Sequence, residues 1–120
     1  MAIDEKDKHK FIFKAEITKN ELLKEGLTVN YAENTDNLKL TKKALCLAFA
    51  DNIEYIEKVY GNKNLDIICI TTRLESSYIL ELLNYVKDIY FVNDKVDEMV
   101  KRISGYVKNY ENRKRGIRGK

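Results

Sequence analysis

Leu65-Asp66-Ile67-Ile68-Cys69-Ile70-Thr71 is the stretch of sequence that decides the fold class. It is a nearly continuous apolar run, which is typical of a central strand covered by helices on both faces. Toward the C-terminus, the apolar residues between Leu74 and Val86 recur every three or four positions and predict a helix. Asp88–Val92 then predicts a short strand, and Val96–Tyr110 predicts a last helix. Helices that connect successive strands in this way indicate parallel pairing in this half of the chain.

Toward the N-terminus the apolar pattern has other periods. Phe11–Ile17 and Leu27–Ala32 alternate in polarity and predict two strands, and the short connection through Gly26 predicts that they pair antiparallel. Between Leu40 and Tyr60 the spacing predicts a long helix, whose apolar face holds Leu45, Phe49, Ile53, Ile56 and Tyr60. The predicted order is strand, strand, helix, strand, helix, strand, helix. The expected fold class is therefore α/β, in two or three layers, with a mixed sheet of about four or five strands.

The chain of 120 residues has the length of one domain. We expect a flexible N-terminus over residues 1–9, a single α/β domain over 10–110 and a basic, disordered tail over 111–120. Apolar residues make up 44% and charged residues 34%, a balance typical of globular rather than disordered chains. No apolar run reaches the roughly 18 residues of a membrane span, and the charged first ten residues do not form a signal peptide. The expected location is the cytoplasm.

Cysteine and histidine are too few for most metal or nucleophile chemistry. Cys46 and Cys69 stand among apolar residues and are predicted to be core thiols rather than a disulfide or metal ligands. His9, the single histidine, lies in a charged stretch without Cys or His neighbours, so neither a metal site nor a catalytic triad is expected around it. The five scattered glycines form no phosphate-binding loop. No cofactor is expected, except Mg²⁺ if the chain is a nuclease.

Positive charge is concentrated at the C-terminus. Residues 107–120 carry six basic side chains against Glu111, a net charge of +5, so the rest of the chain carries −2 of the total of +3. Such a segment can bind the phosphates of nucleic acid, with a merely solubilising tail as the alternative. The predicted phosphate contacts are Arg113, Lys114, Arg115, Arg118 and Lys120. Tyr106 and Tyr110, just before them, fit packing against the core better than stacking on bases.

The predicted order of elements resembles the ribonuclease H-like fold, in which an antiparallel beginning leads into alternating strands and helices. Three short stretches add to the resemblance: Asn34-Thr-Asp-Asn37, Leu65–Thr72 with the helix after it, and Val96-Asp-Glu-Met-Val100 at the start of the last helix. The resemblance covers most of residues 10–110. It implies a mixed sheet and a site that acts on nucleic acid.

The same resemblance implies a cluster of carboxylates around two Mg²⁺ ions, which this sequence lacks. The matching positions hold Ala15, Leu40 and Thr71 or Thr72, and only Asp97 is in register. Glu16 and Glu75 are possible substitutes, with ordinary surface acids as the alternative for both. An acid in the first turn of a helix, such as Asp97, is also favoured by the helix dipole alone. The resemblance therefore implies an inactive nuclease fold.

Thr71, Thr72 and Arg73 follow the predicted central strand, at the edge where open α/β sheets bind ligands. Arg73 is a candidate contact for a phosphate, with an ordinary surface arginine as the alternative.

Two functions from different classes follow from the sequence. The first is a non-catalytic ribonuclease H-like domain that binds nucleic acid through its basic tail. The second is a protein-interaction module or homo-oligomer, such as an inhibitor or assembly factor of a virus or mobile element. A third, metal-dependent nuclease would use Glu16, Glu75 and Asp97 with Mg²⁺.

Overall fold

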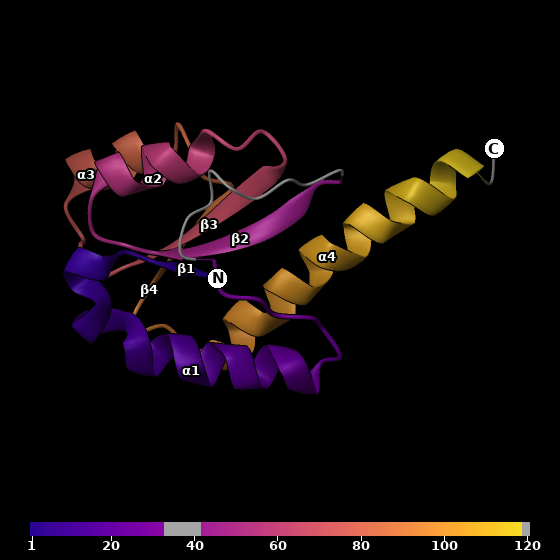
Figure 1. Ribbon diagram of the computed structural model, residues 1–120, viewed down its shortest axis with the longest axis horizontal. Coiled ribbons are helices and arrows are strands. Elements are labelled where there is room, and N and C mark those ends of the chain that lie inside the picture. The colour runs from indigo at the N-terminus through magenta and orange to yellow at the C-terminus, as the bar shows by residue number, and fades with distance from the viewer. Residues whose placement is uncertain (33–41, 119–120) are drawn as a thin grey trace.

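The computed structural model describes residues 1–32 and 42–118, with side chains described as far as Tyr110. Within these residues, a four-stranded sheet lies between two layers of helices (Figure 1). The strands are β1 (Ala2–Ile3), β2 (Ala44–Phe49), β3 (Leu65–Thr71) and β4 (Asp88–Phe91). The helices are a short 3-10 turn, η1 (Glu5–Asp7), then α1 (Lys8–Lys24), α2 (Ile53–Tyr60), α3 (Ser76–Leu82) and α4 (Val96–Arg118). The strand order is β1-β2-β3-β4, and every pair of neighbours is parallel.

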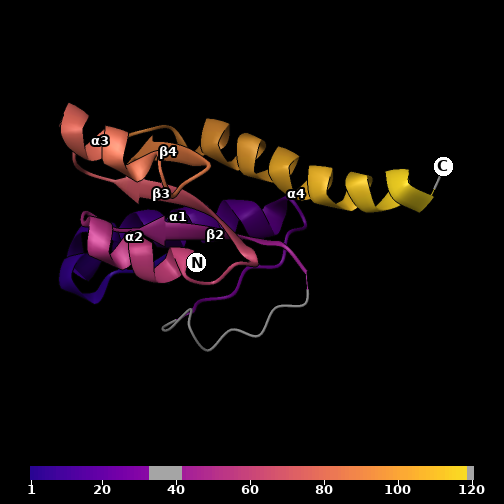
Figure 2. The same ribbon diagram turned by 90° about the horizontal axis from the view of Figure 1, so that it is seen from above.

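The core is divided by the sheet into two apolar clusters. Alternate residues of each strand point to opposite faces, so β2 and β3 are buried on both sides. Cys46, Ala48, Ile67 and Cys69 contribute to the cluster under α2 and α3. Leu47, Phe49, Ile68 and Ile70 contribute to the cluster under α1 and α4. Figures 1 and 2 show these two pairs of helices on opposite sides of the sheet, with α4 projecting beyond it.

The predicted strand over Phe11–Ile17 is wrong, because these residues form part of helix α1. The buried side of α1 consists of Phe11, Ala15, Thr18 and Leu22, whose spacings of four, three and four are those of one helix face. The alternation that suggested a strand also requires Phe13 to be buried, yet Phe13 is 76% exposed. The local pattern fits both periods, and packing against the sheet and α4 selects the helical one.

The long helix predicted from Leu40 to Tyr60 is also wrong in its described part. The apolar run forms strand β2, and a helix, α2, begins only at Ile53. Asn52 separates the two elements, since its side chain accepts a hydrogen bond from the backbone N–H of Tyr55 (2.8 Å) and caps α2. A run of seven apolar residues is compatible with either a buried strand or a buried helix, and periodicity alone does not separate them.

The mixed sheet predicted from these elements is replaced by an all-parallel one. Residues 27–32, predicted as a strand, are not part of a strand but lie beside the start of β1. The Ala32 N–H donates to the Met1 carbonyl (2.8 Å), and the Met1 ammonium donates to the Asn30 carbonyl (2.6 Å). The chain therefore passes from β1 through α1 to one side of β1, and enters β2 on the other side. This reversal explains why α1 and α2 cover opposite faces of the sheet.

The second half of the chain agrees with the sequence-based prediction. The predicted strands are β3 and β4, and the predicted helices are α3 and α4, although α3 begins at Ser76 and leaves Leu74 72% exposed. The expected division into a flexible 1–9, a domain over 10–110 and a disordered 111–120 stays a prediction about mobility. In the structure, β1 and η1 lie in the first of these segments, and α4 extends to Arg118. In the described part of the chain, no helix is long and apolar enough to cross a bilayer.

Both cysteines are free and buried, as predicted, and we expect neither to react with a disulfide reagent such as DTNB at pH 8 in the native protein. Burial raises the pKa of the Cys46 thiol, and it raises the pKa of Cys69 to about 12, so the reactive thiolate is scarce at both positions. Titration in guanidinium chloride should reveal both thiols. Rapid reaction of one thiol without denaturant would contradict the packing of the sheet.

Candidate functional site at the carboxyl edge

The carboxyl edge of the sheet contains a topological switch point. There the chain, after running along one side of β1, adds its next strands on the other side. The chain leaves β1 toward residues 27–32 on one side, whereas β2, β3 and β4 follow on the other. In open α/β sheets, ligands bind outside the carboxyl ends of the strands at such a switch point. Here two acidic residues follow the two strands that flank it: Asp4 follows β1, and Asp51 follows β2 after Ala50.

Asp51 is the centre of this edge. Its side chain is almost completely buried, and both carboxylate oxygens accept hydrogen bonds. Oδ1 accepts from the Thr71 hydroxyl (2.7 Å) and the Thr72 backbone N–H (2.8 Å). Oδ2 accepts from the Thr72 hydroxyl (2.5 Å) and from Lys10 Nζ (3.2 Å). One carboxylate therefore joins the end of β2 to the end of β3 and to the first turn of α1.

Lys10 supplies the positive charge of the site. Its ammonium group lies 3.2 Å from Asp51 Oδ2 and 3.3 Å from Asp7 Oδ1, and thus stands between two carboxylates. Hydrogen bonds to Asp51 and then Asp7 raise the pKa of Lys10 above its ordinary value. Because its side chain is 41% exposed, the ammonium group also remains accessible to an anion in solvent.

The Asp51 carboxylate is held in its charged form. Burial alone raises the pKa of Asp51, but the hydrogen bonds from Thr72, Thr71 and Lys10 outweigh burial and leave this pKa below the ordinary value. An ionised carboxylate is a competent nucleophile toward phosphorus. The hydroxyl, amide and ammonium groups around it are donors of the kind that stabilise the charge of a phosphoryl group during transfer.

Arg73 connects the site to helix α3. Its backbone N–H donates to the Thr71 hydroxyl (3.2 Å), and its guanidinium donates to the Asp51 carbonyl (3.2 Å) and to Glu75 (3.1 Å). The same guanidinium lies 4.1 Å from the centroid of the buried Tyr78 ring, in cation–π geometry. These contacts join the Asp51 cluster to the start of α3. The predicted contact of Arg73 with a phosphate stays a prediction.

Asp4 forms the other half of the switch point. It caps η1 by accepting from the Lys6 backbone N–H (3.2 Å), and it also accepts from the Asn52 side-chain amide. The Asp4 backbone N–H donates to the Phe49 carbonyl (3.0 Å) and extends the pairing of β1 with β2. The loops after β1 and β2 are thus fixed to each other directly beside Asp51.

The acids predicted from the sequence lie on different elements of the structure. Glu16 lies on the exposed side of α1, Glu75 lies just before α3, and Asp97 is exposed in the first turn of α4. Among residues 1–32 and 42–110, no three His, Cys, Asp or Glu side chains are close enough to hold a metal ion. Of the positions matched to missing carboxylates, Ala15 is buried in α1, whereas Thr71 and Thr72 donate to Asp51. Leu40 and Asn34–Asn37 lie outside the described residues.

The basic residues predicted to contact phosphates lie at the end of α4 or after it. Arg113, Lys114, Arg115 and Arg118 are within the helix, their side chains are not among those described, and Lys120 lies outside the described residues. Their contacts with phosphates stay a prediction. Tyr106 and Tyr110 contact the sheet layer instead of facing away from it, since their hydroxyls donate to Asp88 (3.3 Å) and Asp66.

Sequence reasoning missed Asp51, Lys10 and Asp4. The signal for Asp51 was present, since an acidic residue directly follows the apolar run that ends at Ala50. The helix predicted across this run placed Asp51 on a helix surface, where an acidic residue does not indicate a functional site. Lys10 was missed because the predicted strand began at Phe11 and left Lys10 outside every predicted element. The edge that holds Thr71, Thr72 and Arg73 was identified, but not the carboxylate that joins them.

Comparison with known proteins identifies the fold of this chain. No protein-family model matches the sequence, and no curated protein matches it. Among solved structures, the chain is similar to the crystal structure of a response regulator receiver domain protein (CheY-like) from Methanospirillum hungatei JF-1. The TM-score is 0.65 with 17% sequence identity, and the match covers 93% of this chain and 94% of that chain. At this level of identity the likeness establishes the fold alone.

This likeness overturns the resemblance to the ribonuclease H-like fold. The expected antiparallel beginning is a helix, α1, and the described strands are all parallel. The interpretation as a non-catalytic ribonuclease H-like domain that binds nucleic acid is therefore wrong, since it rested on that fold. The chain has the parallel α/β fold of a CheY-like receiver domain.

Proposed function

We propose that this chain is a receiver-type signalling module that accepts a phosphoryl group on Asp51 and presents the altered carboxyl edge to a protein partner. The observation that carries the proposal is the Asp51 cluster: an ionised, buried carboxylate at the switch point of a receiver-like fold, surrounded by four hydrogen-bond donors. The similar structure is described as a response regulator receiver domain, which supports a signalling role.

The proposed step is a simple transfer. A carboxylate oxygen of Asp51 attacks the phosphorus of an activated donor such as an acyl phosphate, the bond from phosphorus to the donor's leaving oxygen breaks, and an aspartyl phosphate forms. Lys10 and the hydroxyls of Thr71 and Thr72 would donate to the phosphoryl oxygens. Because those groups now bond to the carboxylate, phosphorylation would require them to change partners.

The change of partners is what a protein partner would detect. Thr71 also accepts a hydrogen bond from the Arg73 backbone, and Arg73 packs on Tyr78 of α3. We infer that movement of the two threonines toward a phosphoryl group shifts Arg73 and the beginning of α3. Leu74 and Leu80, which are 72% and 66% exposed, lie in this region and supply apolar surface for the partner.

The test is phosphorylation in vitro. Acetyl phosphate with Mg²⁺ in the buffer should add one phosphoryl group, detected by intact mass spectrometry, and hydroxylamine should remove it as it removes acyl phosphates. Asp51→Asn should abolish the addition. Asp66→Asn is the matched control, because Asp66 is a partly buried aspartate beside two lysines at the opposite edge. No incorporation, or incorporation that persists in Asp51→Asn, would overturn the proposal.

A second candidate function is a protein-interaction module that is not phosphorylated. The observation in its favour is that both oxygens of Asp51 already have donors and that Lys10 neutralises the carboxylate. On this reading the cluster only fixes the loops that bind the partner. The two candidates differ in the mass experiment, and in whether Asp51→Asn changes partner binding without any phosphodonor.

We also infer a cytoplasmic location. Both cysteines are free and buried in the core, which fits a reducing compartment.

A further inference from the structure

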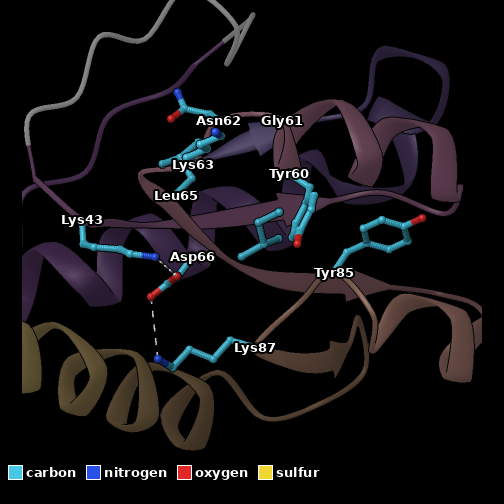
Figure 3. Close-up of a pocket in the computed structure, with 10 residues that line it drawn as sticks. Lys43, Tyr60, Gly61, Asn62, Lys63, Leu65, Asp66, Tyr85 and Lys87 are labelled. Carbon is cyan, nitrogen blue, oxygen red and sulfur yellow. Dashed lines mark hydrogen bonds and ion pairs between the residues drawn. The ribbon is translucent and has the colours of Figure 1, made fainter.

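A pocket lies at the amino edge of the sheet, away from Asp51. It has a volume of about 610 Å³, within the range of roughly 300–1,000 Å³ that is typical of small-molecule sites. Leu65 and Ile67 of β3 line it. Tyr60 and Tyr85 stand on one side (Figure 3). Lysines from the segments before β2 and β4 approach it from two other directions.

The charge of this pocket is positive. Lys43, Lys63 and Lys87 line it together with one acid, Asp66, so the lining carries a formal charge of +2. Asp66 lies between two of the lysines, 3.0 Å from Lys43 Nζ and 3.7 Å from Lys87 Nζ (Figure 3). One carboxylate cannot neutralise two ammonium groups, and Lys63 adds a third that is exposed. An anion with two negative charges would balance the pocket, which favours a phosphate monoester over a carboxylate.

The aromatic side of the pocket indicates the rest of the ligand. The rings of Tyr60 and Tyr85 meet edge to face, with centroids 5.2 Å apart, so each ring fixes the other. Tyr60 nevertheless remains 53% exposed. A rigid, exposed aromatic face is a stacking platform for a planar ring, and stacking of a base on such a face contributes about 1–3 kcal/mol.

We propose that this pocket binds a small phosphate monoester that carries a planar ring, of the size and chemistry of a mononucleotide. The phosphate would lie between Lys43 and Lys87, the ring would lie against Tyr60, and Lys63 would add positive charge farther along the pocket. The carbonyls at the end of α2 would not repel it strongly, since those of Glu57, Lys58 and Val59 accept hydrogen bonds from Gly61 and Asn62. The amino edge does not share residues with the Asp51 cluster, so this proposal does not depend on the proposed function.

Three probes separate the parts of the ligand in a calorimetric titration at low salt: AMP, adenosine and inorganic phosphate. We expect AMP to bind at least about tenfold more tightly than adenosine or phosphate alone, and to weaken as salt is added. Adenosine that binds as well as AMP would overturn the role of the lysines. Phosphate that binds as well as AMP would overturn the role of the tyrosines, and no binding of AMP would overturn the proposal.

Substitutions test whether AMP binds in this pocket. Lys63→Glu should weaken AMP binding by roughly tenfold, whereas the same reversal at Lys101, an exposed lysine of α4 outside the pocket, should leave it within about twofold. Asp66→Asn should tighten AMP binding, because it releases Lys43 and Lys87 from their shared carboxylate. If Asp66→Asn does not fold by circular dichroism, the pair at Lys63 and Lys101 decides. Equal effects at these two positions would overturn the site, and Asp51→Asn should leave AMP binding unchanged.

Discussion

Phe11→Ala is expected to lower the free energy of unfolding by about 3–5 kcal/mol, whereas Phe13→Ala should change it by less than about 0.5 kcal/mol. Phe11 is completely buried between α1 and the sheet, with its ring centroid 6.1 Å from that of Phe49. Truncation would leave a cavity that the surrounding side chains fill only partly. Phe13, two residues later, is 76% exposed and has little packing to lose.

Urea unfolding of the two variants measures this difference. It separates the two interpretations of the segment, because a strand over Phe11–Ile17 would direct Phe11 and Phe13 to the same face and make their losses similar. In helix α1 the two side chains lie on opposite sides. Losses of equal size would therefore contradict α1.

The errors in the N-terminal half have a common physical cause. Residues 11–17 satisfy period two and the helical period at once, and residues 44–50 are apolar at every position, so neither stretch determines its own secondary structure. Their structure is decided by distant partners: α1 packs against α4, and β2 pairs with β3 along its whole length. In the C-terminal half, the helical periods of α3 and α4 are unambiguous, and local reasoning was sufficient there.

The candidate site was partly predictable for the same reason. Because β3 was identified, Thr71, Thr72 and Arg73 were correctly placed at the carboxyl edge. The position of Asp51 follows from β2, which was predicted as a helix. The predicted edge therefore contained the two threonines without the carboxylate to which they donate. Lys10 reaches Asp51 across 41 positions of sequence. A contact of that kind follows from the tertiary arrangement of α1 and cannot be read from a local pattern.

The all-parallel sheet also changes the meaning of the acidic residues. In a ribonuclease H-like arrangement, acids such as Glu16, Glu75 and Asp97 would have to converge on shared metal ions. The receiver-like arrangement instead gives weight to acids that directly follow strands at the switch point, which are Asp4 and Asp51. Four donors contact the Asp51 carboxylate. Its negative charge therefore holds the ends of β2 and β3 and the start of α1 together, in addition to any chemical role.

Asp51→Ala is expected to lower the free energy of unfolding at neutral pH by about 1–3 kcal/mol, because it leaves the Thr71 hydroxyl and the Thr72 N–H without their acceptor. Asp51→Asn should cost less, since the amide oxygen can replace Oδ1, although its NH₂ group cannot pair with Lys10. The difference between the two variants measures the contacts of Oδ1. Thr71→Val, which removes one donor and keeps the carboxylate, is the matched control.

The pH dependence gives the sharper test of the same carboxylate. The pKa of Asp51 in the folded protein lies below its ordinary value, so the unfolded chain takes up a proton at this residue at a higher pH than the folded chain does. Its contribution to stability is therefore complete above the ordinary pKa of an aspartate and is lost as the pH falls through the lower, folded pKa. In urea unfolding between pH 7 and pH 3, the wild type should lose more stability than Asp51→Asn, because the variant has no carboxylate to protonate at this position. Parallel curves for the two proteins would show that Asp51 is not held in its charged form, and the nucleophile proposed for phosphoryl transfer would lose its physical basis.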